Sequence, residues 1–293
     1  MNTDPTLHFV TVASQPHHGL DRLLRSAEHH GLKLQVLGLG QPYLGNGTKI
    51  LRIAELASTL DPRDWVVYTD AYDSVMLADM GGFRAAIEKL DGDLIFSAEQ
   101  NFHLKGHPLF YLWQNWPIYW NYPRVQTPYR FLNAGSFLGR AGRLATLNEE
   151  LAIQAETSSD QSVISRYYCR NPARLRLDQE QRLMTCNGGR IGLEKEDYCW
   201  LDGRLRNNLT GHFPCILHVP GKNEVSIKSI LADSPFPDRT PSSSRDLHLF
   251  AKRARNHRLV QATTRDNFLF KILTKTALVL LVLTALIISL SHL

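Results

Sequence analysis

Short apolar runs alternate with segments of helical apolar spacing through the first part of the chain. The apolar runs, which predict buried strands, are residues 7–13, 34–39, 65–69 and 93–98. The segments with helical spacing are residues 19–30, 48–60 and 82–90. This alternation is typical of a Rossmann-like α/β fold, with a mostly parallel sheet and helices on both faces. Ligands of such sheets bind beyond the carboxyl ends of the strands.

The later part of the chain is less regular. Residues 102–129 are rich in Trp, Tyr and Pro and predict a long surface excursion, a kind of segment that is often functional. We divide the chain into a main α/β domain over 1–233, a Pro/Ser-rich linker with a basic segment over 234–275, and an apolar tail over 276–293.

The apolar tail contains 18 residues without Lys, Arg, Asp or Glu. A helix of this length rises roughly 27 Å, close to the thickness of the hydrocarbon core of a membrane. The tail therefore predicts a transmembrane anchor, and the basic residues before it predict that residues 1–275 lie in the cytoplasm. A buried or interfacial helix is the alternative interpretation.

Charge and cysteine content exclude other classes of protein. The net charge is +5, but residues 251–293 contain seven basic side chains and one acidic one, so the preceding residues are close to neutral. This argues against a nucleic-acid surface on the main domain. The four cysteines lack the spacing of a zinc module and predict free thiols in a reducing compartment, with disulfides left open.

The candidate chemistry begins with Asp70 and Asp73, which follow the third predicted strand. Paired carboxylates suit a hard divalent cation, and such a cation can neutralise the diphosphate of a nucleotide-sugar. The alternative is that both residues cap a turn. Later, His218 ends a short apolar run and could complete a carboxylate and imidazole site. The alternative for His218 is an exposed residue in a turn.

Four further residues carry weaker signals. Gly221 would let the backbone approach a phosphate, and Lys222 would supply positive charge to it. Asn133, in a turn of small residues, could reach sugar hydroxyls or belong to a simple hairpin. Asp160 could act as a base or contact the transferred sugar, or simply favour the dipole of the helix that it opens.

The candidate residues lie in segments that match one known protein family, in the same order along the chain. The chain resembles the glycosyltransferase domain of procollagen lysyl hydroxylases (PLOD) and, more distantly, the collagen and lipopolysaccharide glycosyltransferases. The matching segments are HFVTVAS, LQVLGLG, GNGTKILRIAE, VVYTDAYDSVML, DLIFSAE, FLNAGSFLGR, SSDQSVISRYY, RLRLDQEQRLM and ILHVPGKN. This chain keeps only Asp160 where the family has a run of acidic residues.

The resemblance implies a GT-A fold and a role for each candidate residue. Asp70, Asp73 and His218 would be the metal ligands. The implied contacts to the nucleotide-sugar come from Thr11, Tyr43, Lys49 and Tyr72 at the nucleotide, Gly221 and Lys222 at the diphosphate, and Asn133 and Asp160 at the sugar.

These observations predict a metal-dependent glycosyltransferase that uses Mn²⁺ and a UDP-sugar donor, with galactose or glucose as the sugar. Asp160 and Asn133 would be the catalytic residues. The acceptor would be a hydroxyl on a glycan, a lipid-linked molecule or a protein. Two alternatives remain, namely a hydrolase or nucleotidyltransferase with the same metal site, and a protein that binds UDP-sugar without turning it over.

Overall fold

The computed structural model describes residues 4–105, 111–188, 191–221, 223–238, 241–263, 268–270 and 272–274, with positions 277, 281 and 284. The described strands are β1 (Leu7–Val12), β2 (Leu34–Leu37), β3 (Trp65–Thr69), β4 (Ser74–Met76), β5 (Leu94–Glu99), β6 (Phe131–Arg140), β7 (Arg176–Asp178), β8 (Met184–Cys186), β9 (Tyr198–Leu201), β10 (Arg204–Asn207) and β11 (Ile216–His218). The described helices are α1 (His18–His29), α2 (Gly47–Ala57), α3 (Met80–Ile87), α4 (Tyr111–Asn121), α5 (Ala141–Leu151), α6 (Asp160–Arg170), α7 (Glu194–Asp197), α8 (Glu224–Leu231) and α9 (Ser244–Thr263).

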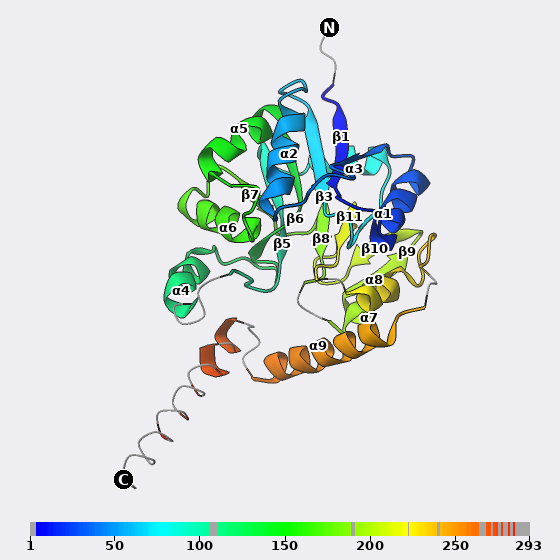
Figure 1. Cartoon of the computed structure of the whole chain (residues 1–293). Coiled ribbons are helices and arrows are strands. Elements are labelled where there is room, and N and C mark those ends of the chain that lie inside the picture. Colours follow the sequence, from blue (N-terminus) through cyan, green and yellow to red (C-terminus); the bar gives the residue numbers. More distant parts are fainter. Residues whose placement is uncertain are drawn as a thin grey trace.

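The central sheet has the strand order β2-β1-β3-β6-β5-β7 (Figure 1). Strands β2, β1 and β3 are parallel, and β5 is parallel to β7. Strand β6 runs antiparallel to both of its neighbours, β3 and β5. The prediction of a mixed α/β fold with a mostly parallel sheet is therefore confirmed.

Helices cover both faces of this sheet because the strand side chains point alternately to opposite sides. On one face, Phe9 and Val67 pack with Leu23 of α1 and Phe83 of α3. On the other face, the neighbouring strand residues pack with helices α2, α5 and α6. Each such fully buried apolar side chain contributes roughly 1.5–3 kcal/mol. The two apolar layers hold the strand ends, and thus the site, in fixed positions.

A second sheet, with the order β4-β11-β8, brings the late part of the chain to the end of β3. Strand β11 is antiparallel to β4, and His218 is paired with Ser74. The backbone N–H of Val219 donates to the carbonyl of Asp73 at 2.8 Å. This register places His218 beside Asp73, which sequence patterns did not show.

The segment predicted as a surface excursion contains helix α4, which has Pro117 inside it. Its aromatic side chains include both exposed and buried ones, since Trp113 is 82% exposed and Tyr119 is 4% exposed. The Trp and Tyr residues here serve partly as core packing. This packing explains why a segment that was predicted as a surface excursion is rich in large apolar side chains.

The expectation of a membrane-anchored protein with its catalytic domain in the cytoplasm is corrected. Across the residues that the structure describes, none of the helices has the length and apolar character needed to cross a bilayer. The longest described helix, α9, carries charged side chains along its length, among them Arg245, Lys252 and Arg258. The predicted span, 276–293, lies outside the described residues apart from positions 277, 281 and 284.

Candidate functional site

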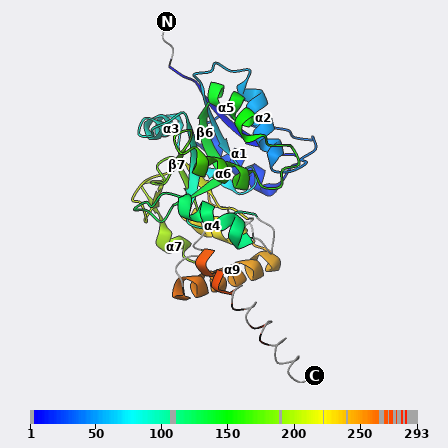
Figure 2. The ribbon, with the colours of Figure 1, turned by 90° about the vertical axis from the view of Figure 1, so that its left-hand side faces the viewer.

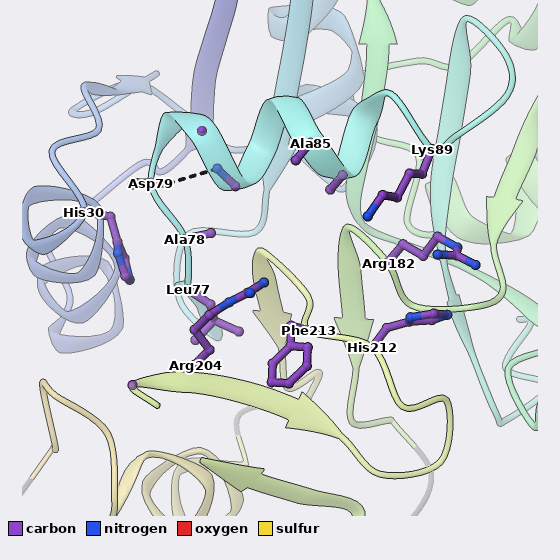
Figure 3. A pocket seen from close by; sticks show the side chains of 14 residues that line it. His30, Leu77, Ala78, Asp79, Ala85, Lys89, Arg182, Arg204, His212 and Phe213 are labelled. Carbon is purple, nitrogen blue, oxygen red and sulfur yellow. Dashed lines mark hydrogen bonds between the residues drawn. The ribbon is translucent and has the colours of Figure 1, made fainter. Parts of the chain in front are cut away.

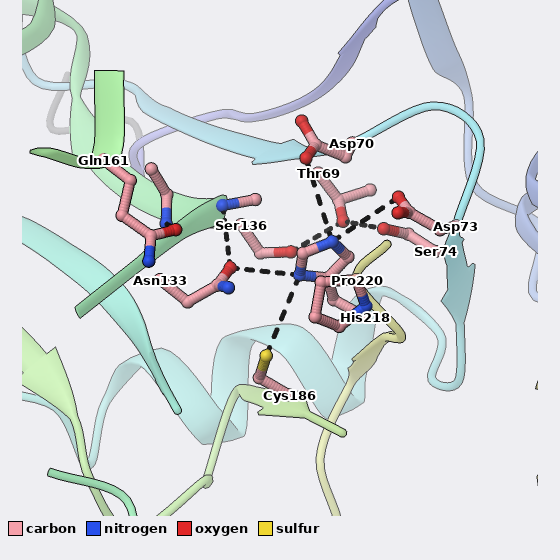
Figure 4. Close-up of polar contacts among 12 residues, drawn as sticks. Thr69, Asp70, Asp73, Ser74, Asn133, Ser136, Gln161, Cys186, His218 and Pro220 are labelled. Carbon is pink, nitrogen blue, oxygen red and sulfur yellow. Dashed lines mark hydrogen bonds and ion pairs between the residues drawn. The ribbon is translucent and has the colours of Figure 1, made fainter. Parts of the chain in front are cut away.

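Asp70, Asp73 and His218 come together at the carboxyl end of β3 (Figure 4). The Nε2 atom of His218 lies 3.4 Å from Oδ1 of Asp73 and 3.8 Å from Oδ2 of Asp70. One potential ligand atom from each residue lies within 4.8 Å of the others. The three residues predicted as ligands thus form a cluster of the size that a single cation requires.

The protonation of His218 is determined by Asn133. The Oδ1 atom of Asn133 accepts the backbone N–H of Gly135 at 2.8 Å, which identifies this atom as the oxygen. His218 Nδ1 lies 3.0 Å from the same oxygen and must therefore be the donor. The other nitrogen, Nε2, is buried and faces the two carboxylates, with Oδ1 of Asp73 at 3.4 Å. Metal-binding histidines have this arrangement, with one ring nitrogen donating to a protein oxygen and the other left for the metal.

The carboxylates raise the pKa of His218. Burial alone would lower this pKa, but the charge and hydrogen bond of Asp73 and the charge of Asp70 outweigh burial. A proton on Nε2 and a divalent cation would occupy the same position between the imidazole and the carboxylates. The donor set, one imidazole and two carboxylates, suits Mn²⁺ among other cations.

A bulge in β6 shapes this corner of the site. Ser97 of β5 pairs with Asn133, but the preceding Phe96 pairs with Phe137, so three residues of β6 have no partner in β5. Within the bulge, the carbonyl of Gly135 accepts the backbone N–H of Asp70 at 2.7 Å. Sequence reasoning found Asn133 but missed Gly135.

Lys49 connects two carboxylates of the site. Its Nζ atom lies 3.1 Å from Oδ1 of Asp70, 3.0 Å from Oδ2 of Asp160 and 3.0 Å from the carbonyl of Ala134. Burial alone would lower the pKa of Lys49, but Asp160 and Asp70 hold it above its ordinary value. Lys49 is therefore a charged residue, and both its position and its charge depend on the carboxylates.

The two carboxylates respond to Lys49 differently. For Asp70, the charges of Lys49 and His218 outweigh burial and lower the pKa. For Asp160, burial outweighs Lys49 and the pKa is raised. Tyr68 donates to Oδ1 of Asp70 at 2.6 Å, a contact that sequence reasoning missed. The environment thus favours the ionised form of Asp70 more than that of Asp160.

The other residues predicted at the nucleotide lie around this centre. The buried Thr11 hydroxyl donates to the carbonyl of Thr69 at 2.7 Å, so it ties β1 to β3. Tyr72 donates to the carbonyl of Gln15 at 3.2 Å. Tyr43 is 42% exposed, as a residue that stacks on a ligand would be.

Gly221 has a φ of +84°, a backbone conformation that favours glycine. Lys222, which was predicted beside it, lies outside the described residues.

A cavity of about 1000 Å³ opens beside the cluster, and its lining includes Asn133 and Gly221. At its inner end, Glu99 accepts hydrogen bonds from Asn133 at 3.1 Å and Gln161 at 2.8 Å. Tyr119 and Trp120 line another part of it. Aromatic rings combined with amide groups are a common lining for polar organic ligands. Glu99 was missed, although it directly follows a predicted strand, as Asp70 does.

A separate cavity of about 640 Å³ is lined by Lys89, Arg182, Arg204 and His212, among others (Figure 3). None of the predicted site residues lines it. Its position beside α3 separates it from the cluster at Asp70.

Comparisons with known proteins identify the family of the chain. A sequence profile of the family described as PLOD GT domain matches residues 3–232. Procollagen-lysine,2-oxoglutarate 5-dioxygenase of Drosophila melanogaster is 25% identical over 244 residues, which cover 78% of this chain and 32% of that protein. Multifunctional procollagen lysine hydroxylase and glycosyltransferase LH3 of Homo sapiens is 25% identical over 232 residues, covering 74% of this chain and 30% of that protein. The chain spans about a third of the length of these relatives.

Among solved structures, a glycosyltransferase involved in the glycosylation of the major capsid of PBCV-1 aligns with a TM-score of 0.40 and 11% identity. The alignment covers 73% of this chain and 93% of that one. A likeness this weak adds nothing to the argument from topology and site geometry.

Proposed function

Because the chain belongs to the PLOD GT domain family of glycosyltransferases, as its motifs predicted, we propose that it transfers galactose or glucose from a UDP-sugar to a hydroxyl acceptor. In this proposal the fold is of GT-A type, and Asp70, Asp73 and His218 hold a divalent cation, Mn²⁺. The observation that carries the proposal is the position of the buried Nε2 of His218, which faces the carboxylates of Asp70 and Asp73.

The proposed roles of the chain's own residues follow from their contacts. A bound cation would neutralise the charge that develops on the leaving diphosphate. Lys49 keeps Asp70 ionised and in position. The Gly221 turn allows the backbone to approach the diphosphate, and Lys222 would add positive charge. Thr11, Tyr43 and Tyr72 would surround the nucleotide.

Asp160 and Asn133 would act at the sugar. The raised pKa of Asp160 suits a group that exchanges a proton with a hydroxyl. Asp160 is 3% exposed and contacts Lys49, so access to it depends on a substrate that displaces or joins this pair. Asn133 lines the cavity and links Glu99 to His218.

A second candidate is a protein that binds UDP-sugar without transferring the sugar. The observation in its favour is that Asp160, the residue kept from the family's acidic run, is buried against Lys49. The two candidates share the donor site and differ only in turnover.

The test uses the full chain with Mn²⁺ and UDP, followed by UDP-galactose and UDP-glucose. A ligand at 100 times its Kd stabilises a protein by about 2.7 kcal/mol. We expect a thermal shift that needs Mn²⁺ and UDP together and is lost in Asp73→Asn. Release of UDP from one of the two donors then supports transfer, and a shift without UDP release supports the binding protein. The absence of any shift in the folded wild-type chain would overturn both.

A further inference from the structure

Helix α9 lies outside the segment that the family profile matches, which ends at residue 232. It nevertheless packs tightly on the domain, since a Cβ on Gly192 would lie 2.9 Å from the Cβ of Ala254. Ala254 and Val260 are both buried. Figures 1 and 2 show α9 running below α7 in both views. In this chain, α9 is therefore a fixed part of the surroundings of the site.

The segment beyond α9 is anchored on the opposite side of the cavity. The ring of Phe268 is fully buried and packs 4.6 Å from the ring of Tyr119 and 4.8 Å from that of Phe102. Arg253 of α9 thus contacts Gly221, and Phe268 contacts Tyr119 of α4. As a result, Arg253, Asn256 and Val260 of α9 form one wall of the 1000 Å³ cavity.

Arg253 is the residue of α9 that reaches the proposed diphosphate turn. Its Nη1 atom donates to the carbonyl of Gly221 at 2.9 Å and to Oδ1 of Asn223. A Cβ on Gly221 would lie 3.7 Å from Nη2 of Arg253. The guanidinium therefore lies directly against Gly221, in the loop that begins at His218.

The charge of Arg253 is not balanced by its contacts, since the carbonyl of Gly221 and Oδ1 of Asn223 are both neutral oxygens. Two other arginines, Arg124 and Arg130, line the same cavity. Within the described part of the chain, no carboxylate forms a salt bridge with any of the three arginines. A guanidinium has five N–H donors, and the recorded bonds use only those of Nη1. Such a group binds phosphate or carboxylate strongly, with a charge-assisted and often bidentate hydrogen bond.

We propose that Arg253 binds a phosphate-type anion of the substrate at the Gly221 turn, so that a helix outside the family-matched segment supplies a binding residue. The anion has two possible sources. It is either the diphosphate of the donor, in which case the inference rests on the proposed function, or a charged group of the acceptor in the same cavity. Both sources would present an anion that replaces water around the half-buried guanidinium of Arg253.

The experiment measures binding to the full chain by titration calorimetry. One arm titrates UDP in the presence of Mn²⁺ at low and high ionic strength, and the other titrates methyl phosphate with and without UDP. The variants are Arg253→Gln, which removes the charge, and Arg253→Lys, which keeps it. Arg255→Gln is the matched control, because Arg255 is an exposed arginine on the same helix. Asn223→Ala breaks the contact with Arg253 and keeps the guanidinium charge.

If the donor supplies the anion, Arg253→Gln should weaken UDP binding at least tenfold and flatten its dependence on salt. Arg253→Lys should recover part of the affinity, and Arg255→Gln should match wild type. If the acceptor supplies it, UDP binding should be unchanged and methyl phosphate binding should be lost in Arg253→Gln. Arg253 would have a purely structural role if Asn223→Ala weakened UDP binding as much as Arg253→Gln does and the salt dependence of UDP binding in Arg253→Gln equalled that of wild type. This result would overturn the proposal.

The two proposals fail separately. A wild-type chain that binds methyl phosphate through Arg253 but not UDP with Mn²⁺ would overturn the donor site and support the anion site. Unchanged binding of both ligands in Arg253→Gln, or no binding of either ligand by wild type, would overturn the role of Arg253.

Discussion

His218 and Gly135 lie so close together that a Cβ on residue 135 would be 2.0 Å from Cε1 of the imidazole. Neither side can move away easily, because His218 ends β11 and Gly135 belongs to the bulge of β6. The bulge thus allows the imidazole to face Asp70 and Asp73. The absence of a side chain at position 135 is part of the geometry of the proposed metal site.

We expect Gly135→Ala to displace His218 and to abolish the thermal shift that Mn²⁺ and UDP produce together. The variant should also lose roughly 1–3 kcal/mol of stability through overpacking. Thermal unfolding with and without the two ligands measures both effects. A shift equal to that of wild type would contradict the proposed need for a glycine at position 135.

Gly81→Ala is the matched control, since Gly81 is exposed in α3 and a Cβ there would lie 3.5 Å from the nearest side-chain atom, Oδ1 of Asp79. Alanine is the better helix former, so this variant should gain about 0.5–1 kcal/mol. Its ligand-induced shift should equal that of wild type.

Patterns along the chain predicted β1, β2, β3 and β5 because each is a local apolar run, but they predicted a turn of small residues within what the structure shows to be strand β6. Asp70 could be placed at the end of β3 for the same reason. The pairing of His218 with Ser74 could not be predicted from such patterns, since it depends on a register between short strands far apart in the sequence. The local pattern made His218 a candidate, with a turn residue as the alternative, and the family resemblance implied its role as the third ligand.

Other features left no signal of this kind. Gly135 and Tyr68 act through contacts that appear only when β3 and β6 pair. The position of Arg253 depends on the packing of a helix that composition alone suggested was a linker and basic segment. Sequence reasoning therefore named Lys49 and Asn133 among the candidates, but it gave no role to Gly135, Tyr68 or Arg253, whose contacts depend on the fold.

Asn133 should control metal affinity without contacting the metal. Removing its oxygen in Asn133→Ala leaves Nδ1 of His218 without an acceptor and frees the ring to change its tautomer. Loss of such a partner typically weakens metal binding by about 10–100-fold. Calorimetric titration of Mn²⁺ in the presence of UDP measures the change.

Asn148→Ala serves as the comparison for Asn133→Ala. Asn148 also accepts a backbone N–H, that of Ile153 at 2.9 Å, but it lies outside the cluster. The Asn148→Ala variant should lower the stability of the protein and leave its affinity for Mn²⁺ unchanged. Equal affinities in all three proteins would contradict the role of Asn133.

Lys49→Met should destabilise the fold because it leaves the buried carboxyl of Asp160 without its cation. Removing one partner of a buried pair costs about 3–5 kcal/mol. Adding Asp160→Asn to Lys49→Met should recover part of this loss, since the double variant no longer buries an uncompensated carboxylate at position 160. Urea unfolding of the two single variants and the double variant gives the coupling free energy, and strict additivity would argue against the pair.

The salt bridge between Arg22 of α1 and Glu224 of α8 should make stability depend on pH. The guanidinium of Arg22 donates to Glu224 at 2.8 Å and to Asp238 at 3.1 Å. Burial alone would raise the pKa of Glu224, but the hydrogen bonds and charge of Arg22 hold it below its ordinary value of 4.5. A carboxyl whose pKa is lower in the folded state stabilises the protein above its unfolded pKa, and this contribution is lost as the pH falls through the folded pKa.

Wild type should therefore be more stable than Glu224→Gln at pH 7, and the difference should shrink as the pH falls below about 4.5. Urea unfolding of both proteins from pH 7 to acid measures this difference. A difference that stays constant over the whole range would mean that Glu224 acts through packing.

Because Glu224 opens α8 directly after Asn223, loss of the salt bridge between Arg22 and Glu224 should also loosen the turn that Arg253 contacts. Acid should thus weaken anion binding in wild type more than in Glu224→Gln.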